Sequence, residues 1–77
     1  MTNYKGSGDW GIRINGGEHG LPHVHVVFKD GSRVSVAIQT RKILAGGVTP
    51  VGRLTAALAD IAKNEQLYLD EYRRLNP

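Results

Sequence analysis

The chain contains no cysteine. Disulfide bonds therefore cannot hold the fold together, and a structural zinc site built on thiolates is excluded as well. Without cysteine, nothing in the composition argues for an oxidising compartment. We expect the protein to work in the cytoplasm.

Long apolar runs are also missing. A membrane-spanning helix needs roughly 18 consecutive apolar residues, and no segment of the chain approaches that length. The N-terminal stretch MTNYKGSGDW lacks the apolar run of a signal peptide. These two absences predict a soluble protein with no recognisable secretion signal and no membrane contact.

The short length of the chain limits the size of its core. A chain of 77 residues forms one domain with a modest core, because so short a chain buries only about 60% of its unfolded surface. A deep, walled substrate cavity is therefore not expected. Apolar residues make up 40% of the chain, which is enough for a folded domain. The net charge of +3 mildly favours an anionic partner, although it is also an ordinary charge for solubility.

The chain changes character near Gly46-Gly47. Short strand-like runs precede this pair, and a helical stretch follows it. The glycine pair is not a phosphate-binding loop, because no Lys or Ser/Thr follows at the required spacing, and no cofactor is expected. Residues 1–9 resemble a flexible N-terminal tail, and residues 10–77 are expected to form a single α+β domain. We predict a small antiparallel sheet of three or four strands, packed on one bent helix or two short ones.

Hydrophobic alternation predicts the strands. In the segment WGIRIN, every second residue is apolar, which is the period of a half-buried strand. Pro22 cannot donate to a sheet ladder, so the next strand is expected to begin at His23 and to end at Phe28. The segment TRKIL after Ile38 either continues the third strand or adds a short fourth one.

The turn after Phe28 decides which side chains face the core. A loop over residues 29–31, with Gly31 in the left-handed conformation, pairs Val26 with Val34. A two-residue loop would instead pair His25 with an apolar residue of the next strand. Burial favours the three-residue loop, because it gathers the apolar side chains on one face. That face comprises Val24, Val26, Phe28, Val34, Val36 and Ile38.

The second half of the chain has the pattern of a helix on a sheet. Thr49 and Pro50 are typical of a helix start, where the threonine hydroxyl caps the first turn. An apolar stripe at helical spacing follows. One straight helix from Pro50 to Leu75 would be about 39 Å long, which is longer than so small a domain is wide. We therefore predict a break near Asn64, whose side chain could cap the second segment.

All three histidines lie within seven residues of one another. His23 and His25 project to the same side of one predicted strand, with α-carbons about 7 Å apart, and His19 precedes them in a glycine-bounded loop. Zinc, nickel and copper accept imidazole ligands of this kind, so a metal site of these three residues is one hypothesis. Glu18 and Asp30 are nearby acidic candidates. The alternative is that His23 and His25 are solvated strand residues.

A metal-free nuclease is another hypothesis. His23 and His25 would then act as acid and base in RNA cleavage, and Arg13, Arg33 or Lys29 would stabilise the charge that develops on the phosphate. A single helical layer is expected to leave this sheet face open to water, without a cleft. The absence of a cleft weighs against catalysis.

The stretch HGLPHVHV resembles the HxPPHFHV signature of a family of small, uncharacterised bacterial domains that are often encoded in toxin–antitoxin pairs. The residues that match the signature are His19, Pro22, His23, His25 and Val26. Leu21 stands where the family usually has its first proline, and Val24 replaces the usual phenylalanine.

The resemblance extends more weakly from Trp10 to Leu75. Glu18 alone represents the acidic residue that the family has before its histidines, and the usual C-terminal tryptophan is absent. The resemblance implies the fold described above, a bacterial or phage setting and a partner protein. It implies no particular reaction.

These patterns favour a small, non-catalytic interaction protein of the toxin–antitoxin or phage anti-defence inhibitor type. Its expected partner is a protein or a nucleoprotein complex with an acidic or phosphate-rich surface, and direct binding of nucleic acid stays open. We expect the contact to be made by a basic, histidine-containing face of the sheet. The residues of that face are His19, His23, His25, Lys29, Arg33, Arg13 and Val27.

Overall fold

The computed structural model describes all 77 residues as a sheet followed by helices. The strands are β1 (Thr2–Tyr4), β2 (Trp10–Ile14), β3 (His23–Phe28), β4 (Arg33–Ala37) and β5 (Ile43–Gly47). A short 3-10 helix, η1 (Val51–Leu54), leads into α1 (Thr55–Lys63) and α2 (Glu65–Leu75). The α+β class is confirmed, but the sheet has five strands rather than the three or four predicted.

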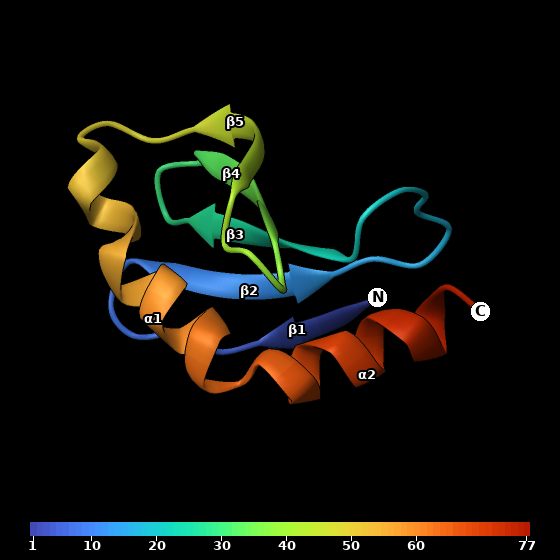
Figure 1. Cartoon of the computed structure of the whole chain (residues 1–77). Coiled ribbons are helices and arrows are strands. Elements are labelled where there is room, and N and C mark those ends of the chain that lie inside the picture. The colour runs from blue at the N-terminus through green and yellow to red at the C-terminus, as the bar shows by residue number, and fades with distance from the viewer.

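The sheet is a simple antiparallel meander. The strands follow one another in the order β1-β2-β3-β4-β5, so each one pairs with its neighbours in the chain. Figure 1 shows η1, α1 and α2 crossing from the β5 edge of the sheet to the β1 edge. None of these helices combines the length and the apolar character that a membrane span requires.

The first nine residues include a strand of the sheet, which corrects the prediction of a flexible tail over residues 1–9. β1 pairs with β2, and the Tyr4 ring packs edge-on against Tyr68 of α2 with ring centroids 4.9 Å apart. The Thr2 hydroxyl donates a hydrogen bond to the Glu71 carboxylate, also on α2. The segment TNY is too short and too polar to show alternation, so its sequence gives no strand signal.

β3 and β4 pair in the predicted register. Val24 lies opposite Val36, and Val26 lies opposite Val34. Gly31 has a φ of 91°, in the left-handed region that the three-residue turn requires. All six residues of the predicted apolar face are buried in the core.

Asp30 ties this turn to η1. One of its carboxylate oxygens accepts the Ser32 backbone N–H at 2.9 Å, and the other accepts the Arg53 guanidinium at 2.9 Å. Arg53 also forms an ion pair with Asp9, and its guanidinium lies 4.9 Å from the centre of the Phe28 ring. Arg53 therefore joins η1 to the β1–β2 and β3–β4 connections of the sheet.

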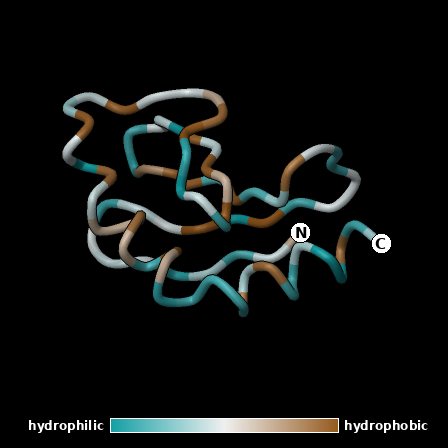
Figure 2. Tube along the Cα trace, in the orientation of Figure 1, coloured by the Kyte–Doolittle hydropathy of each residue, from teal (hydrophilic) through white to brown (hydrophobic).

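The helical half is broken at Asn64, as predicted. The Asn64 side chain donates to the Asp60 carbonyl and carboxylate of the preceding turn, so it ends α1 and does not cap α2. Thr49 does not act as a cap either, because Pro50 is the N-cap of η1 and makes no side-chain bond. Figure 2 shows hydrophobic residues recurring in bands along the otherwise hydrophilic α2. The helical residues buried in the core are Leu54, Ala57, Ile61, Tyr68, Leu69 and Tyr72.

β5 forms an exposed edge of the sheet. All five of its residues are exposed, including the glycine pair at which the sequence changes from strand-like runs to a helical stretch. Gly46 has a φ of 75°, and a Cβ atom at this position would lie 2.2 Å from the Arg33 carbonyl oxygen. Glycine therefore lets β5 approach β4 closely, and the strand extends further than its hydrophobic residues indicate.

The two faces of β3 can be distinguished by removing one valine from each. Val26 is fully buried, so Val26→Ala should lower the free energy of unfolding by about 1–3 kcal/mol. Val27 is the matched control, because it lies on the opposite face and is only half-buried. Urea denaturation should show a smaller loss for Val27→Ala. Equal losses would contradict the assignment of the two faces.

The Asp30 contacts predict a dependence of stability on pH. The Ser32 backbone N–H and the Arg53 guanidinium lower the pKa of Asp30 from 3.8 to about 2. Because the pKa is lower in the folded state, this contribution to stability is complete above about pH 4 and is lost as the pH falls towards about 2. The difference in Tm between the wild type and Asp30→Asn should therefore shrink over that range. If thermal melts show the same difference in Tm at every pH, the contacts of Asp30 with Ser32 and Arg53 do not stabilise the fold.

Candidate functional site

The connection between β2 and β3 carries Glu18 over the start of β3. The Glu18 backbone N–H donates to Oδ1 of Asn76 at 2.7 Å, and Nδ2 of Asn76 donates to the Asn15 carbonyl at 3.0 Å. Gly16 lies close to the end of α2, where a Cβ atom would be 3.3 Å from the Leu75 carbonyl oxygen. The C-terminal end of α2 therefore positions the loop that carries Glu18.

Glu18 meets two of the histidines. Its Oε1 lies 3.3 Å from Nε2 of His25 and 3.8 Å from Nε2 of His23. One ligand atom from each of the three side chains lies within 4.8 Å of the others. The side chains of His23 and His25 are only 11% and 13% exposed, whereas that of Glu18 is 31% exposed. We call these three residues the Glu18–His23–His25 cluster.

The other ring nitrogen of each histidine is also engaged. Nδ1 of His23 lies 2.9 Å from the Leu21 carbonyl oxygen. A carbonyl only accepts hydrogen bonds, so Nδ1 of His23 carries a proton and donates. Nδ1 of His25 lies 3.1 Å from the hydroxyl of Ser35 on β4. These contacts orient the rings so that both Nε2 atoms point towards Glu18.

The cluster has a negative centre. The hydrogen bond with His25 is the largest cause that lowers the pKa of Glu18, and it outweighs the opposing effect of burial. The pKa of Tyr72, whose ring centre lies 5.6 Å from that of His23, is raised by burial and by the Glu18 charge. The carboxylate therefore stays ionised and favours a cation beside it.

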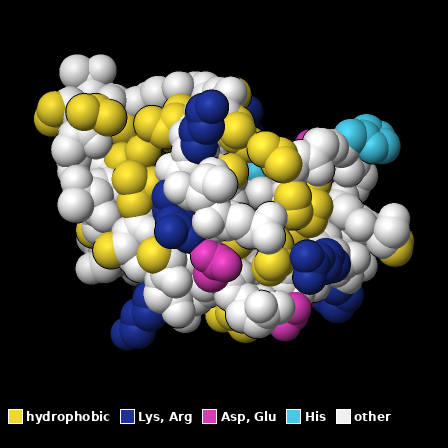
Figure 3. All heavy atoms as spheres, in the orientation of Figure 1, with side chains coloured by type: hydrophobic (Ala, Val, Ile, Leu, Met, Phe, Trp, Pro, Cys, Tyr) yellow, Lys and Arg dark blue, Asp and Glu magenta, His cyan; other side chains and the backbone are white.

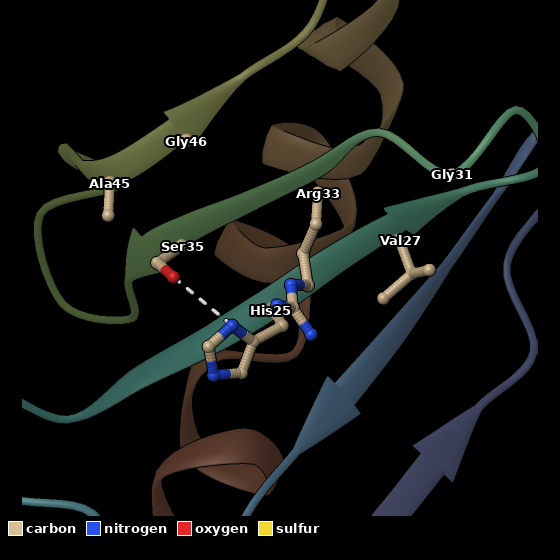
Figure 4. A pocket seen from close by; sticks show the side chains of 7 residues that line it. All are labelled: His25, Val27, Gly31, Arg33, Ser35, Ala45 and Gly46. Carbon is tan, nitrogen blue, oxygen red and sulfur yellow. Dashed lines mark hydrogen bonds between the residues drawn. The ribbon is translucent and has the colours of Figure 1, made fainter.

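A shallow hollow adjoins the cluster on the helix-free face. It has a volume of about 420 Å³ and lies over β3, β4 and β5 (Figure 4). In Figure 4 the Arg33 side chain extends across β3 towards His25, next to Val27. Arg33 forms no ion pair with an acidic side chain. The residues that line the hollow are His25, Val27, Gly31, Arg33, Ser35, Ala45 and Gly46.

Of the seven predicted site residues, three lie where the sequence suggested and four do not. Arg33 and Val27 are on the helix-free face, and Lys29 is exposed at the turn beside it. His23 and His25 share that face but are largely buried, which corrects the expectation of solvated histidines on an open sheet. His19 is exposed and lies outside the cluster. Figure 3 shows that some histidine atoms reach the surface on this side of the molecule.

Arg13 makes a local contact rather than joining the hollow. It lies opposite His25 in the sheet, and its Nε donates to Oδ1 of Asn3 at 3.2 Å. Sequence reasoning missed Asn76 and Ser35 as supports of the cluster. No sequence signal marks Asn76, because its contacts with Glu18 and Asn15 join distant parts of the chain, whereas the predicted register of β3 and β4 already places Ser35 opposite His25.

These features define a small α+β domain with a carboxylate–histidine cluster and a basic hollow on the helix-free face of a five-stranded meander. The chain belongs to the family described as a domain of unknown function, DUF4160, whose model matches residues 10–73. This range includes the whole cluster and the hollow and leaves out β1. Comparisons with curated proteins and with solved structures give no match.

The contact between α2 and the loop can be tested at Asn76. Asn76→Ala removes the acceptor for the Glu18 N–H, so exchange of that amide with deuterium should speed up by about fivefold, the factor that corresponds to roughly 1 kcal/mol for one hydrogen bond. NMR-detected hydrogen exchange measures this rate. Asn3→Ala is the control, because Asn3 accepts a hydrogen bond from Arg13 and none from the loop that carries Glu18. An unchanged Glu18 rate in Asn76→Ala would refute the role of Asn76.

Proposed function

We propose that the protein is a small, non-catalytic interaction protein that binds an acidic or phosphate-rich partner on the helix-free face of its sheet. The observation that carries this proposal is Arg33, an unpaired guanidinium at a hollow between β3 and β5. The partner is a protein or a nucleoprotein complex. The proposed setting is the cytoplasm of a bacterium or of a phage-infected bacterium, and docking requires no cofactor.

The chemistry of the hollow suits an anion. A guanidinium presents a planar set of donors that matches carboxylate and phosphate oxygens. The Ser35 hydroxyl lies nearby, Val27 supplies an apolar surface, and Lys29 is exposed at the adjoining turn. An apolar centre with cationic donors around it is a common composition of a recognition patch.

The shape of the hollow suits a macromolecule. It is shallow and bounded on one side by β5, an exposed edge strand. Enclosed pockets usually bury most of a small ligand, whereas this hollow is partly open to solvent. An exposed edge leaves a large partner free access to Arg33 from the side of β5.

The likeness of HGLPHVHV to the HxPPHFHV signature supports the biological setting. It favours a member of a toxin–antitoxin pair or a phage anti-defence inhibitor, in which a small domain acts by binding another macromolecule. The protein-binding role explains why the hollow needs no catalytic group.

The alternative of a metal-free nuclease has less support. Its acid and base would be Nε2 atoms of His23 and His25, but both atoms face the Glu18 carboxylate instead of solvent. A phosphate approaching them would meet a negative charge. The largely buried rings also leave little room for a phosphodiester.

Binding of polyanions tests the docking surface. We expect poly-glutamate, titrated into the labelled protein, to shift the NMR signals of the residues lining the hollow more than those of the helices. Binding should weaken as salt rises, because exposed charges are screened over about 8–10 Å at physiological ionic strength. A DNA duplex of similar charge serves as a second probe. Stronger binding to DNA than to poly-glutamate would favour a nucleoprotein complex over an acidic protein as the partner.

Charge reversal tests whether the helix-free face of the sheet is the docking surface. The double variant Lys29→Glu with Arg33→Glu should abolish poly-glutamate binding and leave the melting temperature little changed, since both side chains are exposed. The matched control is Lys63→Glu with Arg73→Glu, which makes the same change in net charge on exposed helical positions. If the control loses binding as strongly as the test variant, the hollow is not the docking surface.

A further inference from the structure

We propose that the Glu18–His23–His25 cluster binds one divalent transition-metal ion of the zinc type, with Glu18 rather than His19 as the third ligand. This site adjoins the docking hollow and shares His25 with it, but Arg33 is not one of its ligands.

The hydrogen bonding of His23 gives the first argument. Its Nδ1 donates to the Leu21 carbonyl, so in the neutral ring the lone pair is on Nε2. That lone pair faces Oε1 of Glu18, another acceptor, at 3.8 Å. Two acceptors facing each other repel unless positive charge lies between them. A metal ion bound by both atoms satisfies this arrangement.

The outward contacts of both rings give the second argument. Histidines that ligate metals usually bond their remaining nitrogen to a carbonyl, a carboxylate or another polar group, which fixes the ring and its tautomer. His23 has the Leu21 carbonyl in this position, and His25 has the Ser35 hydroxyl. Both Nε2 atoms are thereby held in a common direction, as a metal site requires.

The spacing of the donor atoms gives the third argument. Ligands about 2.1 Å from a tetrahedral ion lie about 3.4 Å from one another. The Glu18 oxygen is 3.3 Å and 3.8 Å from the two histidine nitrogens, and all three donors lie within 4.8 Å. Small rotations of the three side chains would bring these donor atoms to bonding distance from one central ion. His19 is exposed and takes no part in this arrangement.

The donor set indicates the class of ion. Two imidazoles with one carboxylate suit zinc and its first-row neighbours, whereas calcium and magnesium prefer oxygen ligands throughout. Three protein ligands leave a further coordination position for water or for a group from a partner. The partial burial of both rings reduces competition from solvent at the nitrogens.

The ion is not needed for folding. All three ligands lie between residues 18 and 25, so the ion would close only a short loop and the sheet does not depend on it to form. Thermal melts of the untagged protein with and without a chelator should therefore coincide. Added zinc should raise the melting temperature by mass action, because it binds the folded state.

Equilibrium dialysis of the full, untagged chain against zinc tests the site. We expect one ion per chain, with affinity in the micromolar range or tighter. Glu18→Gln keeps the size of the side chain and should weaken binding by at least about tenfold, as should His25→Gln. His19→Gln is the matched control and should change the affinity by less than about twofold. Arg33→Ala removes the guanidinium of the docking hollow but none of the three ligands, so it should keep zinc binding.

Cobalt(II) supplies an independent spectroscopic measurement. A site with protein nitrogen and oxygen ligands gives cobalt a visible absorption band, which should be lost in Glu18→Gln and kept in His19→Gln. Circular dichroism establishes that each variant is folded, and Glu18→Gln is the decisive one because its side chain is the most exposed of the three. The proposal is overturned if the wild type takes up no zinc, or if folded Glu18→Gln binds as well as the wild type, or if His19→Gln loses binding.

Discussion

The left-handed conformation of Gly31 closes the β3–β4 turn in three residues, and the register that results determines both faces of the sheet. Valines of β3 and β4 then meet on one face and pack against the helices. His25, Arg33 and Ser35 lie on the other face and form the polar surface. A shift of one residue would turn His25 into the core and expose the valines. The hydrophobic core and the candidate site therefore depend on the same turn.

Much of this fold can be predicted from local sequence. The bounds of β3, its register with β4 and the break at Asn64 follow from alternation, from one glycine and from the length of the helical stretch. β1 and most of β5 do not, because TNY and AGG carry no periodic signal and form strands only through their partners. At Asn64 the predicted position of the helix break is confirmed, but the prediction that its side chain caps the second helix is wrong.

The candidate site is less predictable than the fold for a physical reason. Alternation places His23 and His25 on one face of a strand, but the third member comes from a loop rich in glycine, whose path is not set locally. Contacts with the end of α2 decide that Glu18 turns inwards while His19 points to solvent. Glu18 from this loop lies beside both histidines and the Tyr72 ring of α2 lies beside His23, so their burial could not be inferred from strand position alone.

The bond between the Glu18 N–H and Asn76 joins residues 58 positions apart in the chain. The hairpins of the meander join segments that are close in sequence, and closing a short loop costs less entropy than closing a long one. Contacts of low sequence separation therefore form early in folding. The two histidines can take their places on β3 as soon as the hairpins form. The Glu18 backbone is held by Asn76 at the end of α2, so we expect the carboxylate to be fixed beside the histidines only once α2 has docked.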